Sequence, residues 1–124
     1  MAYILIVDDD PDVRTYLTTL FRDHGHETDT AEDGVLGLEK AKSRRPDLIT
    51  LDVIMPNQTG VKMYRSIVAD PDCKDVPVLI VSGVTQYKEL FSRDHKTMPK
   101  PAAFIEKPVD RDVLLEMINK LVSA

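Results

Sequence analysis

Short apolar runs alternate along this chain with longer segments whose apolar residues recur at helical spacing. Runs of four or five residues bounded by turn residues predict buried β-strands. A further segment at residues 27–30 is polar but β-prone, which favours a strand at the edge of a sheet. The expected strands are Tyr3–Val7, residues 27–30, Leu48–Leu51, Val78–Val81 and Ala103–Ile105.

The segments between the strands predict five helices. Asp10 is a suitable N-cap for the first helix, Pro11 suits its first position, and Gly25 favours its end. The second helix has Val35, Leu38 and Ala41 as its apolar residues. This second helix is expected over Asp33–Ser43, and the third and fourth over Thr59–Ala69 and Thr85–Arg93. The last helix is expected in the segment that carries Val113, Leu114, Met117, Ile118 and Leu121.

Strict alternation of strands and helices is typical of an α/β fold, in which helices cover both faces of a parallel sheet. Because crossovers between parallel strands are right-handed, the carboxyl ends of all strands meet at one edge of the sheet. Ligands of such folds bind at that edge, where the strand order reverses.

Composition limits the function classes that remain. The chain has 124 residues, a formal net charge of −5 and one cysteine, Cys73. This length fits one domain over residues 1–124 and leaves no room for an output domain. The sequence has no stripe of Lys and Arg, which argues against nucleic acid as a partner. No apolar run is long enough to span a membrane. A single free thiol suits a reducing cytoplasm, where we expect the protein to work.

Polar residues with compatible chemistry end four of the strands. The first strand is followed by Asp8 and Asp9, the third by Asp52, the fourth by Ser82 and the fifth by Lys107. Crowded carboxylates repel one another unless a cation joins them. Because all the ligands are oxygens, that cation should be Mg²⁺, or Mn²⁺, rather than Zn²⁺. A carboxylate beside a metal, a hydroxyl and an ammonium group is suited to phosphoryl transfer.

The sequence resembles the receiver domain of two-component response regulators over essentially its whole length. The resemblance rests on four motifs in this order: Ile6-Val7-Asp8-Asp9-Asp10, Leu51-Asp52-Val53-Ile54-Met55-Pro56 with Gly60, Val81-Ser82-Gly83, and Phe104-Ile105-Glu106-Lys107-Pro108. It implies a flavodoxin-like, doubly wound sheet of five parallel strands in the order 2-1-3-4-5, with five helices in a single domain.

The resemblance also implies a role for each motif residue. Asp52 would accept the phosphoryl group from a histidine kinase or a phosphotransfer protein. Mg²⁺ would be held by Asp9, Asp52 and the backbone carbonyl of Ile54, with Asp8 acting through water. Ser82 and Lys107 would bind phosphoryl oxygens. Phe104 would turn inward when Ser82 moves toward the phosphate, and the Lys107–Pro108 peptide bond would be cis.

The chain departs from the family pattern between the fourth and fifth strands. Two prolines, Pro99 and Pro101, stand there and should shorten or break the helix that family members usually have. Since family members commonly bind their targets on this face, residues 92–104 are the candidate surface for a downstream protein partner. His24, His26 and His95 have no second ligand at metal-binding spacing, so solvated histidines are expected.

Two residues should govern the lifetime of the phosphate. Ile54 lies two positions after the acceptor and Val84 lies two positions after Ser82. Family members whose phosphoaspartate is short-lived often carry polar residues there, which can orient the attacking water. Because both side chains are apolar here, we expect a long-lived phosphoaspartate, and Asn at position 54 with Glu at position 84 should shorten its lifetime.

Two alternatives remain open from the residues alone. Asp8 and Asp10 form a D-x-D pattern like that of metal-dependent phosphohydrolases of the haloacid dehalogenase kind, but that interpretation leaves Asp52 without a role. A pseudo-receiver that only binds partners is the other alternative, and the intact acidic set argues against it. The receiver interpretation implies that the protein is no enzyme beyond its own phosphorylation and dephosphorylation.

Overall fold

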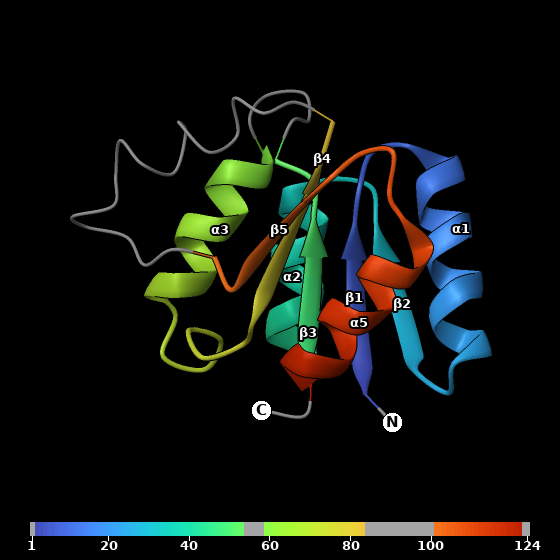
Figure 1. Ribbon diagram of the computed structural model, residues 1–124. Coiled ribbons are helices and arrows are strands. Elements are labelled where there is room, and N and C mark those ends of the chain that lie inside the picture. The colour runs from blue at the N-terminus through green and yellow to red at the C-terminus, as the bar shows by residue number, and fades with distance from the viewer. Residues whose placement is uncertain (1, 54–58, 84–100, 123–124) are drawn as a thin grey trace.

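A computed structural model describes residues 2–53, 59–83 and 101–122 as an α/β domain (Figure 1). Its sheet has five parallel strands in the order β2-β1-β3-β4-β5, as expected. The strands are β1 (Tyr3–Val7), β2 (Glu27–Ala31), β3 (Leu48–Leu51), β4 (Val78–Ser82) and β5 (Ala103–Glu106). The helices are α1 (Pro11–Asp23), α2 (Gly34–Ser43), α3 (Thr59–Ala69) and α5 (Arg111–Val122).

The described residues therefore contain four of the five predicted helices. The helix expected over residues 85–93 lies outside the described ranges, as do His95, Pro99 and most of the candidate partner surface at residues 92–104. None of the described helices is both long and apolar enough to cross a membrane.

The first helix begins and ends where the sequence predicts. The side chain of Asp10 accepts a hydrogen bond from the Asp12 amide, and Pro11 occupies the first turn. Gly25 follows the helix with φ +84°, a conformation that favours glycine. The Asp10 cap fixes the start of α1 directly after the loop that carries Asp8 and Asp9.

Two apolar cores lie on opposite faces of the sheet. Leu17, Phe21, Leu114 and Ile118 pack with one set of strand residues beneath α1 and α5. Met63, Tyr64 and Ile67 of α3 pack with the alternate set on the other face, which α2 also covers. Because side chains alternate across a strand, every second residue faces the same core.

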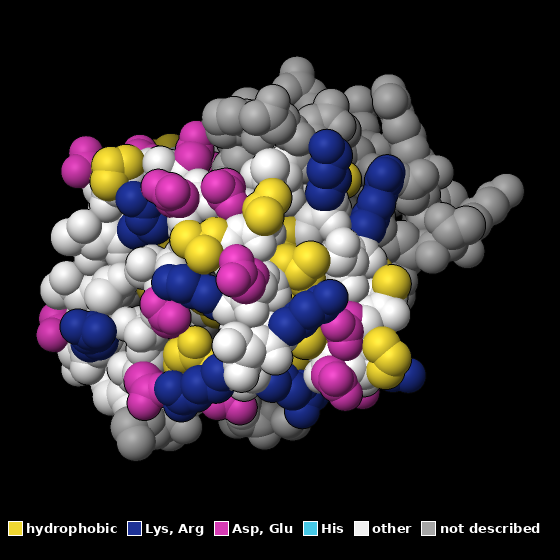
Figure 2. Space-filling view, turned by 180° about the vertical axis from the view of Figure 1, so that it is seen from behind, with side chains coloured by type: hydrophobic (Ala, Val, Ile, Leu, Met, Phe, Trp, Pro, Cys, Tyr) yellow, Lys and Arg dark blue, Asp and Glu magenta, His cyan; other side chains and the backbone are white. Residues whose placement is uncertain are grey.

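The predicted apolar face of α2 is wrong at Val35. Its side chain is 69% exposed, and the buried residues of the helix are Gly34, Gly37 and Ala41. The backbone of α2 packs closely on α3, so its contact face consists of small residues instead of branched ones. From behind, this side of the molecule shows acidic, basic and apolar side chains interspersed (Figure 2).

Two further expectations concern single side chains. Cys73 is free, as predicted, but it is buried in the α2–α3 core, and burial raises the pKa of its thiol. His24 is exposed, whereas the solvated state expected for His26 is wrong. His26 is half-buried and its Nδ1 accepts a hydrogen bond from the Ala2 amide at 3.1 Å, while burial lowers its pKa.

Replacing Thr50 with valine should raise the free energy of unfolding by about 1 kcal/mol. The Thr50 side chain is 1% exposed, and its hydroxyl has no hydrogen-bond partner among the described residues. Valine keeps the shape and removes the buried hydroxyl. Urea denaturation checks this, with exposed Thr19→Val as the control that should change little; a less stable Thr50→Val protein would contradict the prediction.

Candidate functional site

The alternation of side chains brings three predicted site residues to one face of the sheet edge. Ile6, Leu48 and Ile105 all face the core beneath α1 and α5. Asp8, Asp52 and Lys107 follow them by an even number of residues, so they lie on the same face of the sheet. Backbone hydrogen bonds extend this edge beyond the strands, since the Asp52 amide donates to the Val7 carbonyl at 3.0 Å. The Lys107 amide likewise donates to the Ser82 carbonyl at 2.8 Å, and the Lys107–Pro108 bond is cis, as predicted.

The Lys107 ammonium bridges the two buried carboxylates. Its Nζ lies 2.8 Å from Oδ2 of Asp8 and 3.1 Å from Oδ2 of Asp52. The two aspartates are only 2% and 5% exposed. Partial burial alone would lower the pKa of Lys107, but the hydrogen bonds and negative charges of both aspartates outweigh burial and raise it. Lys107 therefore stays charged beside two carboxylates.

Asp9 completes a set of three carboxylates. One oxygen each from Asp8, Asp9 and Asp52 lies within 4.8 Å of the others. Asp9 is exposed, whereas its two neighbours are buried, so the set opens to solvent on one side. An all-oxygen set with an open side fits Mg²⁺, which keeps several waters when it binds to proteins.

Two contacts hold Asp8 in place, and the sequence analysis identified neither of them. The Asp10 amide donates to Oδ1 of Asp8 at 2.9 Å, and Nη1 of Arg14 donates to the Asp8 carbonyl at 2.7 Å. The Arg14 contact joins α1 to the loop after β1. An arginine one turn into a helix gives no sequence signal for such a bond.

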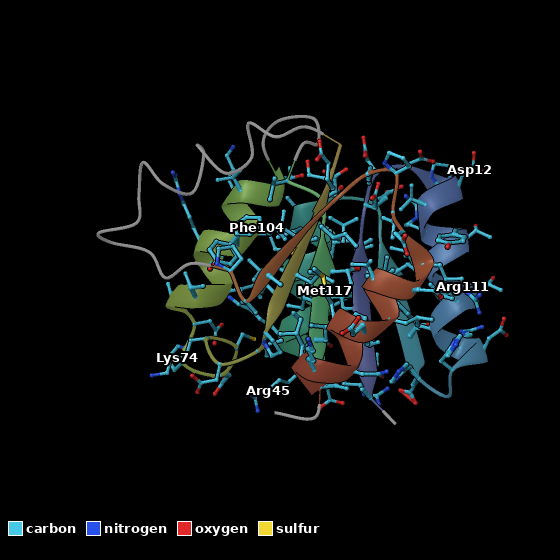
Figure 3. All side chains as sticks on the ribbon, in the orientation of Figure 1. Asp12, Arg45, Lys74, Phe104, Arg111 and Met117 are labelled. Atoms are coloured by element: carbon cyan, nitrogen blue, oxygen red, sulfur yellow. The ribbon has the colours of Figure 1, made fainter. Side chains whose placement is uncertain are left out.

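Ser82 and Phe104 lie on the other face of the sheet from the carboxylates. Phe104 pairs with Ile80 across β4 and β5, so Ser82, two residues after Ile80, faces the same side. The Ser82 hydroxyl is fully buried and has no hydrogen-bond partner among the described residues. Phe104 is half-buried and lies on the side of β5 toward α3 (Figure 3). The two predicted switch residues are therefore neighbours, while Ile54 and Val84 lie outside the described residues.

An apolar hollow of about 240 Å³ adjoins the site between α1 and the loop after β5. Val13 and Tyr16 line it from α1, and Pro108 and Val109 line it from the loop. Tyr16 is 45% exposed there, which is high for a large aromatic side chain. The hollow also reaches the side chain of Lys107.

Known proteins are similar to this chain in sequence and fold. A family model described as the response regulator receiver domain matches residues 4–119. PilH of Pseudomonas aeruginosa is 34% identical and covers 99% of both chains. Rrf1 of Nitratidesulfovibrio vulgaris is 32% identical over 98% of this chain and 83% of its own.

Solved structures agree with the sequence matches. The chemotaxis protein CheY4 of Vibrio cholerae superposes with a TM-score of 0.85 at 29% identity, over 98% of each chain. The response regulator TrrA of Thermotoga maritima, solved in complex with Mg²⁺ and BeF, gives a TM-score of 0.84 at 30% identity, over 98% of this chain and 99% of that chain.

Proposed function

This chain belongs to the response regulator receiver domain family, and we propose that it is a switch controlled by phosphorylation of Asp52. The observation that carries the proposal is the bridge from Lys107 to Asp8 and Asp52, with Asp9 beside them at the carboxyl edge of the sheet. A buried carboxylate between a cation and two further carboxylates suits acceptance of a phosphoryl group.

The carboxylates have distinct roles in this proposal. Within the three-carboxylate set, Asp9 and Asp52 would hold Mg²⁺ directly and Asp8 would act through water. The family pattern adds the backbone carbonyl of Ile54. The ion supplies charge neutralisation for phosphoryl oxygens when it is bound. TrrA, whose structure contains Mg²⁺ and BeF, supports this assignment through its similarity to the chain.

The transfer step uses Asp52 as the nucleophile. One carboxylate oxygen of Asp52 forms a bond to phosphorus while the phosphorus–nitrogen bond of a phosphohistidine breaks, and the electron pair returns to the donor imidazole. Lys107 then pairs with the phosphoryl oxygens, because its ammonium already lies 3.1 Å from Asp52. The Ser82 hydroxyl, buried without a described partner, turns toward the new oxygens and Phe104 follows it inward.

The remaining parts of the proposal rest on the family. The donor is a histidine kinase or a phosphotransfer protein, the target is a protein, and the location is the cytoplasm. The chain catalyses only its own phosphorylation and dephosphorylation. A slow loss of phosphate, set by Ile54 and Val84, stays a prediction.

Intact mass spectrometry tests the proposal directly. Incubation with Mg²⁺ and acetyl phosphate should add one phosphate to the wild-type chain and none to Asp52→Asn. Turnover of a small phosphate ester without an adduct would favour the phosphohydrolase alternative. A chain that neither gains phosphate nor hydrolyses an ester would be a pseudo-receiver.

The apolar hollow beside Lys107 is the proposed docking point for the protein donor. Tyr16→Ala should slow phosphotransfer from a histidine phosphotransfer protein about tenfold, since truncating an exposed aromatic anchor removes binding energy. Phosphorylation by acetyl phosphate should stay unchanged, because this donor needs no docking surface. Stopped-flow or gel assays with both donors measure the effect. Val35→Ala, exposed on α2, is the control, and equal slowing with both donors would refute the docking role.

A further inference from the structure

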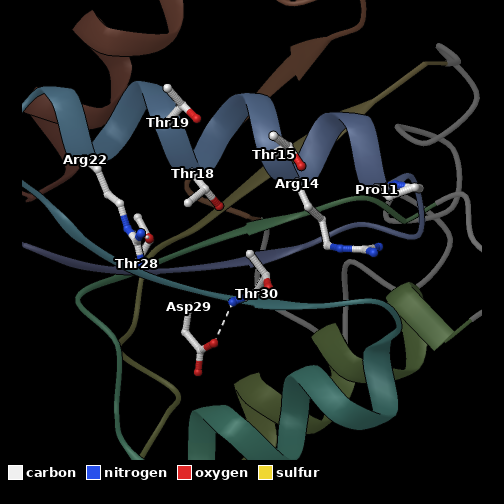
Figure 4. Close-up of a pocket in the computed structure, with 9 residues that line it drawn as sticks. All are labelled: Pro11, Arg14, Thr15, Thr18, Thr19, Arg22, Thr28, Asp29 and Thr30. Carbon is white, nitrogen blue, oxygen red and sulfur yellow. Dashed lines mark hydrogen bonds between the residues drawn. The ribbon is translucent and has the colours of Figure 1, made fainter.

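A second hollow lies between α1 and the edge strand β2, and none of its lining residues is a predicted phosphorylation or metal-binding residue (Figure 4). It measures about 330 Å³ and is lined by two arginines, Arg14 and Arg22, and by five threonines from the two elements. Guanidinium groups and hydroxyls are hydrogen-bonding groups suited to carboxylates and phosphates. The polar lining of this hollow thus differs from the apolar lining of the hollow on the other side of α1.

Neither arginine has an acidic partner within ion-pair distance in the part of the chain that the structure describes. Arg14 donates to the Asp8 backbone carbonyl at 2.7 Å, and Arg22 donates through Nε to the Thr28 hydroxyl at 3.1 Å. Both acceptors are neutral, so both positive charges remain unbalanced. In a chain with a formal net charge of −5, this groove is a site of local positive charge.

Asp29 is the acidic residue that lines the groove, and its charge is already balanced. Its Oδ1 accepts hydrogen bonds from the Thr30 amide at 2.8 Å and from Nζ of Lys40 at 3.0 Å. Lys40 also donates to the Thr30 carbonyl. These bonds occupy the backbone groups of Thr30, so a partner strand cannot pair with β2 at this residue. At this point of the groove, a ligand is therefore recognised by side chains.

The spacing of the arginines limits the shape of the ligand. Eight residues of α-helix separate Arg14 from Arg22, a rise of about 12 Å. A single phosphate is too small to reach both groups. Two carboxylates four residues apart on an extended peptide lie about 13 Å apart and point to the same side.

We propose that the α1–β2 groove binds an extended acidic segment of a partner protein, with two carboxylates on Arg14 and Arg22 and with the threonine hydroxyls between them. The carboxylates form charge-assisted hydrogen bonds with the guanidinium groups. The groove lies on the face of α1 away from Tyr16, so it can be occupied while the phosphodonor docks.

Fluorescence anisotropy tests the proposal with a labelled extended peptide that carries two glutamates four residues apart. The same peptide with glutamines should bind at least tenfold more weakly. Arg22→Gln should weaken binding of the glutamate peptide about tenfold, the loss expected for one charge-assisted contact. Arg22→Lys should give an intermediate loss, because lysine keeps the charge without the planar fork. Asp52→Asn should bind like the wild type, which separates this proposal from phosphorylation.

Arg45→Gln is the matched control, because Arg45 is exposed at the end of the molecule opposite the carboxyl edge (Figure 3). It should leave peptide affinity unchanged. Equal binding of the glutamate and glutamine peptides would overturn the proposal, as would an equal loss in Arg45→Gln and Arg22→Gln. Amide shifts that map the peptide away from α1 and β2 would also overturn it, and so would tighter binding of a single-stranded oligonucleotide to the same arginines.

Discussion

Replacing Asp9 with alanine is expected to lower the affinity for Mg²⁺ about a hundredfold or more. Asp9 is the exposed member of the three-carboxylate set, and no described cation pairs with its side chain. Its charge is thus fully available to an incoming ion. Removing one of few protein ligands is costly for Mg²⁺, which is held by a small number of carboxylates. Isothermal titration with MgCl₂ measures the change.

Asp10→Asn is the control for this experiment. Asp10 is adjacent in sequence and also lies at the carboxyl edge, but its side chain caps α1 by accepting from the Asp12 amide. Asparagine caps helices equally well, so the fold should be kept. Comparable losses in Asp9→Ala and Asp10→Asn would show that Mg²⁺ responds to the general negative charge of this edge and has no specific ligand at Asp9.

Lys107→Met should change Mg²⁺ affinity in the opposite direction. The ammonium of Lys107 bridges Asp8 and Asp52 and therefore competes with a metal ion for the same oxygens. Without it the ion should bind about tenfold more tightly, a change of ~1.4 kcal/mol. The conformational response to a phosphoryl mimic should be lost at the same time, because no cation remains to pair with the phosphoryl oxygens. Amide shifts with and without beryllofluoride measure that response.

The sequence allowed the site to be predicted because of one property of parallel sheets. Asp8, Asp52 and Lys107 are far apart along the chain, but each follows a strand, and all strand ends meet at one edge. The side-chain alternation then decides which of them share a face. The Arg14 bond to the Asp8 carbonyl could not be predicted in this way, because it depends on how α1 packs beside β1.

The place of Val35 on the apolar face of α2 was predicted wrongly for a related reason, whereas Leu38 and Ala41 do face the core. Hydrophobic spacing identifies the largest apolar side chains, and Val35 is the first of these in the helix. Where two helices approach closely, however, the contact requires the smallest residues, and Gly34 and Gly37 fill it. A sequence pattern does not reveal the distance between two helices, which is set by the sheet beneath them.

The glycines of α2 lead to a prediction about stability with a large effect: Gly34→Ala should destabilise the protein by about 3 kcal/mol. A Cβ at this position would lie 1.9 Å from the carbonyl oxygen of Thr59 and 2.4 Å from its carbonyl carbon. Both are backbone atoms at the start of α3, so no rotamer change relieves the clash. The two helices must move apart, which loosens the core between them. Urea denaturation followed by circular dichroism measures the loss.

Gly37→Ala provides the matched comparison within the same helix. Its Cβ would meet Sδ of Met63 at 2.8 Å and Cγ2 of Val7 at 2.9 Å, and these are side-chain atoms, of which the methionine is flexible. The cost should therefore be about 1 kcal/mol, partly offset by the better helix propensity of alanine. Equally small losses in the two variants would show that α2 and α3 can separate freely. In that case their close contact would not hold α3, whose Gly60 packs directly against the Asp52 carbonyl, in position beside the phosphorylation site.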